Sequence, residues 1–265
     1  FGTGGAKACL IDAEAKELSY AYVELDIIQE HPGWSEHDAG SYWPVTCGLI
    51  GRCLADSGAD PGDIKGVAVS SALPSLVLVD RRGLPLTNAY NLMDRRAVVE
   101  VEHLRQTFGD DELFAISGNR LEDHPVLVNL LWEKHNRPDI FAAVGHALTI
   151  DGYVSFRLTG RPTLHHSGAA FYGAAYNLRE RRVETALLEL LGIDPEIIPD
   201  LCDCEEVIGT VSRQASMETG LAETTLVAGG QVDCNASWVG AGAIGVGDFQ
   251  SNLGTVGNFG VVHNN

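Results

Sequence analysis

Two short segments near opposite ends of the sequence combine glycine with threonine in a pattern that suits phosphate binding. The first is Gly2-Thr3-Gly4-Gly5, directly before an apolar strand pattern that contains Lys7, and the second is Gly254-Thr255-Val256-Gly257. Glycine lets backbone N–H groups approach a phosphate closely, and threonine hydroxyl and lysine ammonium groups add donors. Each segment alone could equally be the tip of a hairpin. As a pair, far apart in sequence, they suit two lobes that grip one polyphosphate.

An aspartate, Asp233, follows a glycine pair in the glycine-rich segment 227–260, between the two glycine–threonine turns. An aspartate in this position commonly forms a turn or caps the N-terminus of a helix. The alternative is catalytic, because a carboxylate can act as a general base and take the proton of a hydroxyl group that attacks a phosphoryl group. The residue types alone leave both interpretations open.

These residues need a scaffold, and the hydrophobic pattern predicts one. Residues 7–11 and 18–27 are typical of two strands of a hairpin, and residues 38–57 show helical spacing with Asp38 as N-cap. Further strands are expected at 64–71, 75–86 and 147–150, and helices at 94–108, 124–136, 150–158 and 182–192. Strands that come early and then alternate with helices predict an α/β fold with a mixed sheet.

The composition is that of a soluble globular protein, with 45% hydrophobic and 20% charged residues among 265. This length suffices for one large domain or two smaller ones. A formal net charge of −18 disfavours nucleic acids and anionic membranes as partners, and no apolar run is long enough for a membrane-spanning helix. The six cysteines include no CxxC pair, which predicts a reduced, cytoplasmic location. Cys202 and Cys204 lack the second cluster that a zinc site needs.

Several stretches, taken in order, resemble one known family. They are FGTGGAK (1–7), GWSEHDAGSYW (33–43), the segment 69–97 that ends in an Asp-Arg-Arg motif, GGQVDCNASWVGAG (229–242) and LGTVG (253–257). Together they are similar to the N-terminal half of the FGGY-family carbohydrate kinases. The resemblance implies a ribonuclease-H-like (actin-like ATPase) domain, in which helices flank a mixed β-sheet.

The resemblance also implies a domain division. Residues 1–248 would form the sugar-binding and catalytic domain, and residues 249–265 would form the first hairpin of a second, ATP-binding domain. Chains of this family are roughly twice as long, and an aspartate normally precedes the first phosphate loop. We therefore expect the sequence to be the N-terminal part of a longer protein.

The function that the resemblance implies is ATP-dependent phosphorylation of a hydroxyl group of a ketose or polyol, with ATP and Mg²⁺ as cofactors. Asp233 would be the general base and would reach the metal ion through water. Phosphate contacts are implied for Gly2, Thr3, Gly4, Lys7, Gly254 and Thr255. The alternative is a non-catalytic sugar-binding or regulatory relative that keeps the fold, and a homodimer is a candidate assembly. The stretch GWSEHDAGSYW argues against any other actin-like ATPase.

Some of the residues implied at the sugar depart from the family pattern, and others match it. The full set is Leu73, Pro74, Asp94, Arg96, His124 and Cys234. Kinases similar to xylulokinase have Met-His in place of Leu73 and Pro74, and glycerol kinases have Arg-Glu there. Many relatives have Asn or Gln in place of Cys234. The reaction class therefore carries over and the identity of the sugar does not, and we expect a less polar pocket than in a xylulokinase.

Two of these assignments have structural alternatives. Asp94 and Arg96 could form a structural pair, and His124 could be a surface residue at the start of a helix. Other conspicuous side chains are expected to serve packing, namely Trp34, Trp43, Trp132 and Trp238. The adjacent His165 and His166 do not have a metal-ligand spacing, and they are predicted to lie in a solvated loop.

Overall fold

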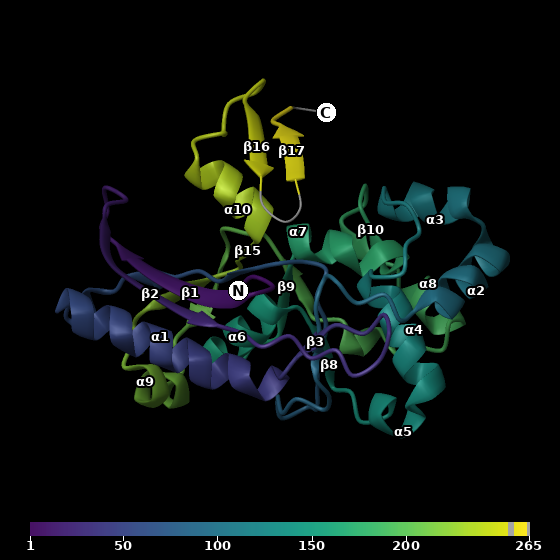
Figure 1. Ribbon diagram of the computed structural model, residues 1–265, viewed down its shortest axis with the longest axis horizontal. Coiled ribbons are helices and arrows are strands. Elements are labelled where there is room, and N and C mark those ends of the chain that lie inside the picture. The colour runs from purple at the N-terminus through teal and green to yellow at the C-terminus, as the bar shows by residue number, and fades with distance from the viewer. Residues whose placement is uncertain (254–256, 264–265) are drawn as a thin grey trace.

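In the computed structural model, which describes residues 1–253 and 257–263, helices surround a set of short strands (Figure 1). The first two strands, β1 (Gly5–Ile11) and β2 (Glu17–Glu24), form the antiparallel hairpin that the sequence predicts. Exposure alternates along both strands, as in a sheet with one face packed on the interior and one face towards solvent. The first glycine-rich segment leads directly into this hairpin.

Helix α1 (Tyr42–Ser57) covers the inner face of the hairpin, where Leu49 and Cys53 pack against alanines of the two strands. Asp38 is an N-cap, as predicted, but it caps a short 3-10 turn that precedes α1. Its side chain accepts the N–H of Gly40. The helix therefore begins four residues after the predicted start, and the same aspartate ends the preceding extended segment.

The other strands within the main body are short and combine both directions of pairing. They are β3 (Glu36–His37), β4 (Gly66–Val67), β5 (Ser70–Ser71), β6 (Val77–Val79), β7 (Ala89–Tyr90), β8 (His146–Leu148), β9 (Thr163–His165), β10 (Tyr176–Asn177), β11 (Arg182–Val183), β12 (Asp200–Cys202), β13 (Val207–Thr210), β14 (Leu226–Ala228) and β15 (Gln231–Val232). The pairs β14–β4, β15–β5 and β12–β9 are parallel. The pairs β13–β14, β6–β8, β3–β7 and β10–β11 are antiparallel. The predicted mixed α/β arrangement is confirmed.

The remaining helices pack in two groups on either side of these strands. They are α2 (Val98–Phe108), α3 (Asp110–Ser117), α4 (Val126–Asn136), α5 (Pro138–Phe141), α6 (Ile150–Thr159), α7 (His166–Ala169), α8 (Thr185–Leu190), α9 (Arg213–Thr219) and α10 (Asp233–Gly240). In Figure 1, α1, α6 and α9 lie on one side, and α2 to α5 with α8 lie on the other. Each side has its own hydrophobic cluster. Strand β6 separates them, because Leu78 points into one cluster while Val77 and Val79 point into the other.

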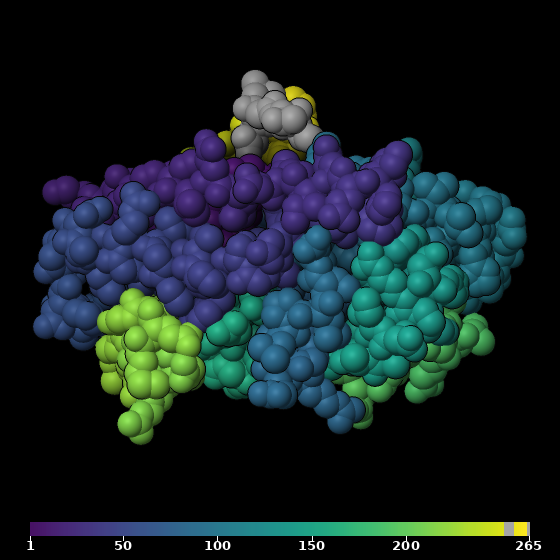
Figure 2. Space-filling model, turned by 60° about the horizontal axis from the view of Figure 1, so that its bottom comes forward, coloured from purple at the N-terminus to yellow at the C-terminus, as the bar shows by residue number. Residues whose placement is uncertain are grey.

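Near the C-terminus, β16 (Phe249–Leu253) and β17 (Gly257–Val261) form an antiparallel hairpin, as predicted. In Figure 1 this hairpin stands above the main body and α10 leads up to it, and yellow atoms of this part of the chain are visible at the top of the space-filling view (Figure 2). Trp238 of α10 packs on Gly260 so closely that a Cβ atom there would overlap its ring. The assignment of the hairpin to a second domain remains a prediction.

Several predicted elements differ from those observed. The helix expected at 94–108 begins at Val98, because residues 94–97 are held by buried polar contacts described below. The helix expected at 182–192 is divided into β11 and α8. The prediction of a solvated loop is wrong for His165, which ends β9 and is 1% exposed. Among the helices described, none is long and apolar enough to cross a membrane.

Candidate active site

The site is built around two neighbouring strands, β5 and β15. They are parallel, with Gln231 opposite Ser70 and Val232 opposite Ser71. The residues that follow parallel strands leave the sheet at the same edge, which is where ligands bind in many α/β proteins. The segment after β5 therefore begins beside Asp233, the residue that directly follows β15.

A third segment joins the same edge at the start of the chain. The backbone nitrogen of Phe1 donates to the carbonyl oxygen of Ser70 at 2.7 Å, and the N–H of Ala72 donates to the carbonyl oxygen of Phe1 at 2.8 Å. This alternation is the hydrogen-bond pattern of a parallel pair. Phe1 thus runs alongside β5 in the same direction, and Gly2, Thr3 and Gly4 leave at the edge where Asp233 lies.

The glycine turn at residues 2–4 is held by its backbone. The N–H of Gly2 donates to Gly5 at 2.9 Å, and the carbonyl oxygen of Thr3 lies 2.9 Å from Nε2 of His37. Burial lowers the pKa of His37, which keeps this ring neutral. The N–H groups of Thr3 and Gly4 have no acceptor within the described part of the chain. The turn therefore presents free donors, as a phosphate-binding turn requires.

Asp233 is the first residue of α10, and its exposed carboxylate makes few contacts with the described residues. Oδ1 accepts the N–H of Cys234 at 2.7 Å, and Oδ2 has no partner among residues 1–253 and 257–263. The N-cap of α10 is Val232. Asp233 therefore does not cap the helix, which was one of the roles that the sequence allowed for it. Partial desolvation by surrounding segments raises the pKa of Asp233, although the carboxylate remains open to solvent, while the Cys234 N–H and Lys7 oppose the rise.

Three of the residues implied at the sugar meet at this edge. Leu73 and Pro74 follow β5, are buried, and are joined by a cis peptide bond. Cys234 follows Asp233 and is half-buried, and burial raises the pKa of its thiol. The segment that leaves β5 at this edge is therefore apolar at Leu73 and Pro74. Gly254 and Thr255, implied at the phosphates, lie outside the described residues.

Asp94 and Arg96 form the structural pair that the sequence left as an alternative. Nη2 of Arg96 lies 2.6 Å from Oδ2 of Asp94 and 2.6 Å from Oε1 of Glu36, and all three side chains are buried. The guanidinium group also stacks over Trp34, with 3.7 Å between Cζ and the ring centroid. Trp34 packs edge-on against Trp132, as expected of packing residues. The motif GWSEHDAGSYW thus supplies partners to the later Asp-Arg-Arg motif.

His124 lies two residues before α4 and is mostly buried. Its Nδ1 is 3.3 Å from Oε2 of Glu122 and 3.5 Å from Oδ1 of Asp123. Burial lowers the pKa of His124 and outweighs these two carboxylates. Its side chain is 20% exposed, so it is not a fully solvated surface histidine. Its contact with a sugar stays a prediction.

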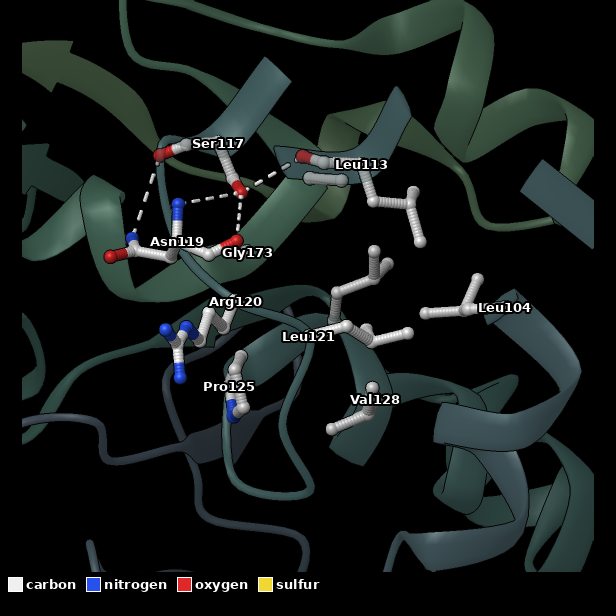
Figure 3. A pocket seen from close by; sticks show the side chains of 11 residues that line it. Leu104, Leu113, Ser117, Asn119, Arg120, Leu121, Pro125, Val128 and Gly173 are labelled. Carbon is white, nitrogen blue, oxygen red and sulfur yellow. Dashed lines mark hydrogen bonds between the residues drawn. The ribbon is translucent and has the colours of Figure 1, made fainter. Parts of the chain in front are cut away.

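Two cavities of the described structure lie elsewhere. A cavity of about 20 Å³, room for a single water molecule, is shown in Figure 3. Its lining is apolar at Leu104, Leu113 and Val128 and polar at Ser117 and Asn119. A larger hollow of about 250 Å³ lies around Arg81 and His146. Neither includes Asp233 among its lining residues.

The sequence did not indicate a polar cluster next to this edge, in which Asp151 and His165 are buried and Ser167 and Gln231 are partly buried. The four residues are joined by hydrogen bonds. Asp151 follows a predicted helix start, and His165 was expected in solvent. No spacing along the sequence connects them, because they come from α6, the end of β9, α7 and β15.

Comparison with known proteins agrees with this geometry. Residues 1–240 match the N-terminal domain of the FGGY family of carbohydrate kinases. The chain is 27% identical to the xylulose kinase of Bacillus subtilis over 256 residues, which are 97% of this chain and 51% of that protein. It is 28% identical to an autoinducer-2 kinase of Enterobacter sp., covering 93% of this chain and 47% of that protein. The chain thus spans about half the length of these relatives.

The solved structures give the same result. The xylulose kinase of Rhodospirillum rubrum superposes with a TM-score of 0.91 at 28% identity, over 97% of this chain and 53% of that one. A xylulose kinase from Brucella ovis gives 0.90 at 29% identity, over 97% and 52%. These likenesses confirm the predicted α/β fold of the actin-like ATPase class. With the family matched over residues 1–240, the chain belongs to the FGGY family of carbohydrate kinases.

Proposed function

We propose that the complete protein transfers the γ-phosphoryl group of ATP to a hydroxyl group of a ketose or polyol, with Asp233 as general base. The observation that carries this proposal is the meeting of three chain segments at one sheet edge. They are the glycine turn 2–4, the segment 72–74 and the start of α10. Phosphoryl transfer depends on positioning and charge stabilisation at one place, which such a convergence provides.

The roles follow from the contacts. Asp233 would take the proton of the attacking hydroxyl group through Oδ2, since Oδ1 is bonded to the Cys234 N–H. The free N–H groups of the turn 2–4 would bind phosphate oxygens, and Lys7 on β1 would add positive charge. Gly254 and Thr255 would contact the same phosphates from the other side.

The residues fit a magnesium ion held mainly by its substrate. No three His, Cys, Asp or Glu side chains converge on a metal position in the part of the chain that the structure describes. Mg²⁺ usually keeps several water molecules and binds through one or two carboxylates and the phosphates of a nucleotide. Asp233 would contact the ion through water. When bound, Mg²⁺ supplies neutralisation of the charge on the phosphates.

For the substrate, we propose a ketose or polyol other than D-xylulose. Leu73 and Pro74 offer no side-chain hydrogen bonds, and both are buried in the segment that follows β5. Relatives of this chain are named for xylulose, autoinducer-2 and L-xylulose/3-keto-L-gulonate, which supports a substrate other than D-xylulose as one of the candidates. Cys234 would line this pocket. Asp94 and Arg96 would support it from their buried pair, and His124 would contact the substrate from the loop before α4.

The test is a screen of the full-length protein against ketoses and polyols, with release of ADP as the signal. Saturable turnover with one sugar supports the kinase. Sugar binding that is accompanied neither by turnover nor by sugar-stimulated nucleotide hydrolysis would favour the non-catalytic relative. The apolar Leu73 and Pro74 are the best argument for that alternative. We place the activity in the cytoplasm, consistent with six free cysteines, and we keep a homodimer as a prediction that sedimentation can test.

A further inference from the structure

The polar cluster next to the candidate site contains a buried acid–histidine pair that the proposed chemistry does not use. Oδ2 of Asp151 lies 2.5 Å from Nε2 of His165, and their side chains are 0% and 1% exposed. The other oxygen of Asp151 accepts the hydroxyl hydrogen of Ser71 in β5. The pair is therefore fixed on one side to the strand that Leu73 and Pro74 follow.

Ser167 connects this pair to the other strand of the site. Its Oγ lies 2.9 Å from Nδ1 of His165 and donates to Oε1 of Gln231. The same Oε1 accepts the N–H of Val232 at 2.9 Å. Val232 is the N-cap of α10 and directly precedes Asp233. Three hydrogen bonds thus connect the buried histidine with Val232, the residue that directly precedes the base.

The backbone before β15 is held in a different way. Gly230 has φ of +99°, and a Cβ atom there would lie 2.6 Å from the carbonyl oxygen of Val69. Its N–H donates to Cys204 at 3.0 Å, and the N–H of Gly229 donates to Glu206 at 2.8 Å. Backbone contacts therefore fix residues 229–230. At residues 231–232, side-chain hydrogen bonds from the cluster add to the pairing with β5.

The side chain of Asp233 makes few contacts with the described residues. Its carboxylate is exposed, and among the residues described it is bonded only to the N–H of its own neighbour, Cys234. The direction of the carboxylate is therefore set by the backbone at the β15–α10 junction. A general base must lie within hydrogen-bond reach of the proton that it takes, and a misplacement of about 1 Å can cost about 100-fold in rate.

We propose that Ser167 and Gln231 are positioning residues of the phosphoryl-transfer site. They transmit the fixed position of the Asp151–His165 pair to the β15–α10 junction and so hold Asp233 in line with the substrate hydroxyl group. This inference rests on the proposed function, because it assigns the two residues to the base of that reaction. Neither residue needs to contact sugar or nucleotide.

The test uses the full-length protein with the best sugar of the screen. Ser167→Ala removes the hydrogen bonds of Oγ with His165 and Gln231, and Gln231→Met removes those of Oε1 with Ser167 and Val232. Both keep side-chain volume nearly constant. We expect kcat to fall about tenfold or more, since a single hydrogen bond can be worth about that factor, with KM for the sugar within about threefold. The double variant should lose no more than the single ones, because both act on one connection. Ser167→Thr, which keeps the hydroxyl group, should restore most of kcat.

A second readout does not depend on turnover. Cys234 is half-buried beside Asp233, whereas Cys9 is exposed on β1. A looser β15–α10 junction should raise the rate at which iodoacetamide alkylates Cys234 several-fold relative to Cys9. Ser57→Ala, at the distant end of α1, is the control and should change neither kcat nor this ratio.

The outcomes separate the two proposals. If Asp233→Asn lowers kcat strongly while Ser167→Ala and Gln231→Met leave kcat and the alkylation ratio unchanged, the positioning role is overturned and the kinase stands. If the wild type and the Asp233→Asn variant turn over alike, the assigned base is wrong and the positioning role falls with it. If Ser167→Ala folds poorly, Gln231→Met and Ser167→Thr decide by the same criteria.

Discussion

The replacement of Asp233 by asparagine removes the proposed base with little other change. Asparagine has nearly the same volume, and its Oδ1 can accept the same N–H of Cys234. The position is the first of α10, where the loss of a negative charge costs about 0.3–1 kcal/mol through the helix dipole. The variant should therefore fold, with a small loss of stability.

The expected loss of rate is much larger. A general base contributes about 10²–10⁴-fold, which corresponds to about 3–5 kcal/mol at 1.36 kcal/mol for each factor of ten. Because the carboxylate makes only one described contact, this loss cannot come from a collapsed site. Sugar binding should remain within a few-fold of the wild type, since the pocket walls at Leu73 and Pro74 are unchanged.

The assay compares ADP release by the full-length wild type and the Asp233→Asn variant, with sugar affinity measured by calorimetry. Asp63→Asn is the matched control, because Asp63 is an exposed aspartate whose one ion pair, with Lys65, lies on the surface. Turnover by Asp233→Asn within about tenfold of the wild type would refute the base assignment. An equal loss in the Asp63 control would show that the assay reports general damage instead.

Three further predictions concern substrate, pH and stability. D-xylulose should be phosphorylated poorly by the full-length protein, because Leu73 and Pro74 offer it no hydrogen bonds, and turnover typical of a dedicated xylulokinase would contradict this. Burial lowers the pKa of His165, but the adjacent Asp151 carboxylate outweighs it and raises the pKa to about 9. The protonated ring therefore stabilises the fold fully below the ordinary histidine pKa of about 6.5, and this contribution should disappear as the pH rises through about 9. Urea denaturation of the wild type and His165→Gln should show their difference in unfolding free energy shrinking over this range. A constant difference would instead mean a neutral ring, the form that suits the 2.9 Å contact from the Gly168 N–H to Nδ1. Arg96→Leu should lower the unfolding free energy by about 3–5 kcal/mol, because it leaves Asp94 and Glu36 buried without a counter-charge. A loss below about 1 kcal/mol by the same measurement would show that the pair is not structural.

The sequence predicted what depends on local pattern. The first hairpin and α1 have clear periodicity and a capping aspartate, so both were found within a few residues. The two glycine–threonine turns and Asp233 were singled out by residue type, and the family resemblance gave them roles. Local signals were sufficient because a turn or a cap needs only neighbouring residues.

The contacts that assemble the site could not be predicted in this way. Strands β5 and β15 have two residues each, too few for any hydrophobic period, and they pair across more than half of the chain. His165 was placed in solvent because no neighbour in sequence indicates that Asp151 will bury it. Asp94 and Arg96 were recognised, but their partner Glu36 lies in a separate motif.

The order of strands at the site has a consequence for how the protein is made. Phe1 lies beside β5 and β5 lies beside β15, yet the three are far apart in the sequence, so that β5 is synthesised long before β15. During translation, at about 5–20 residues per second, one edge of β5 remains unpaired for many seconds until β15 has been synthesised. An unpaired edge readily binds other strands. A nascent chain that does not yet include residue 232 should therefore bind chaperones preferentially. The chaperones would release the chain once β15 has paired with β5.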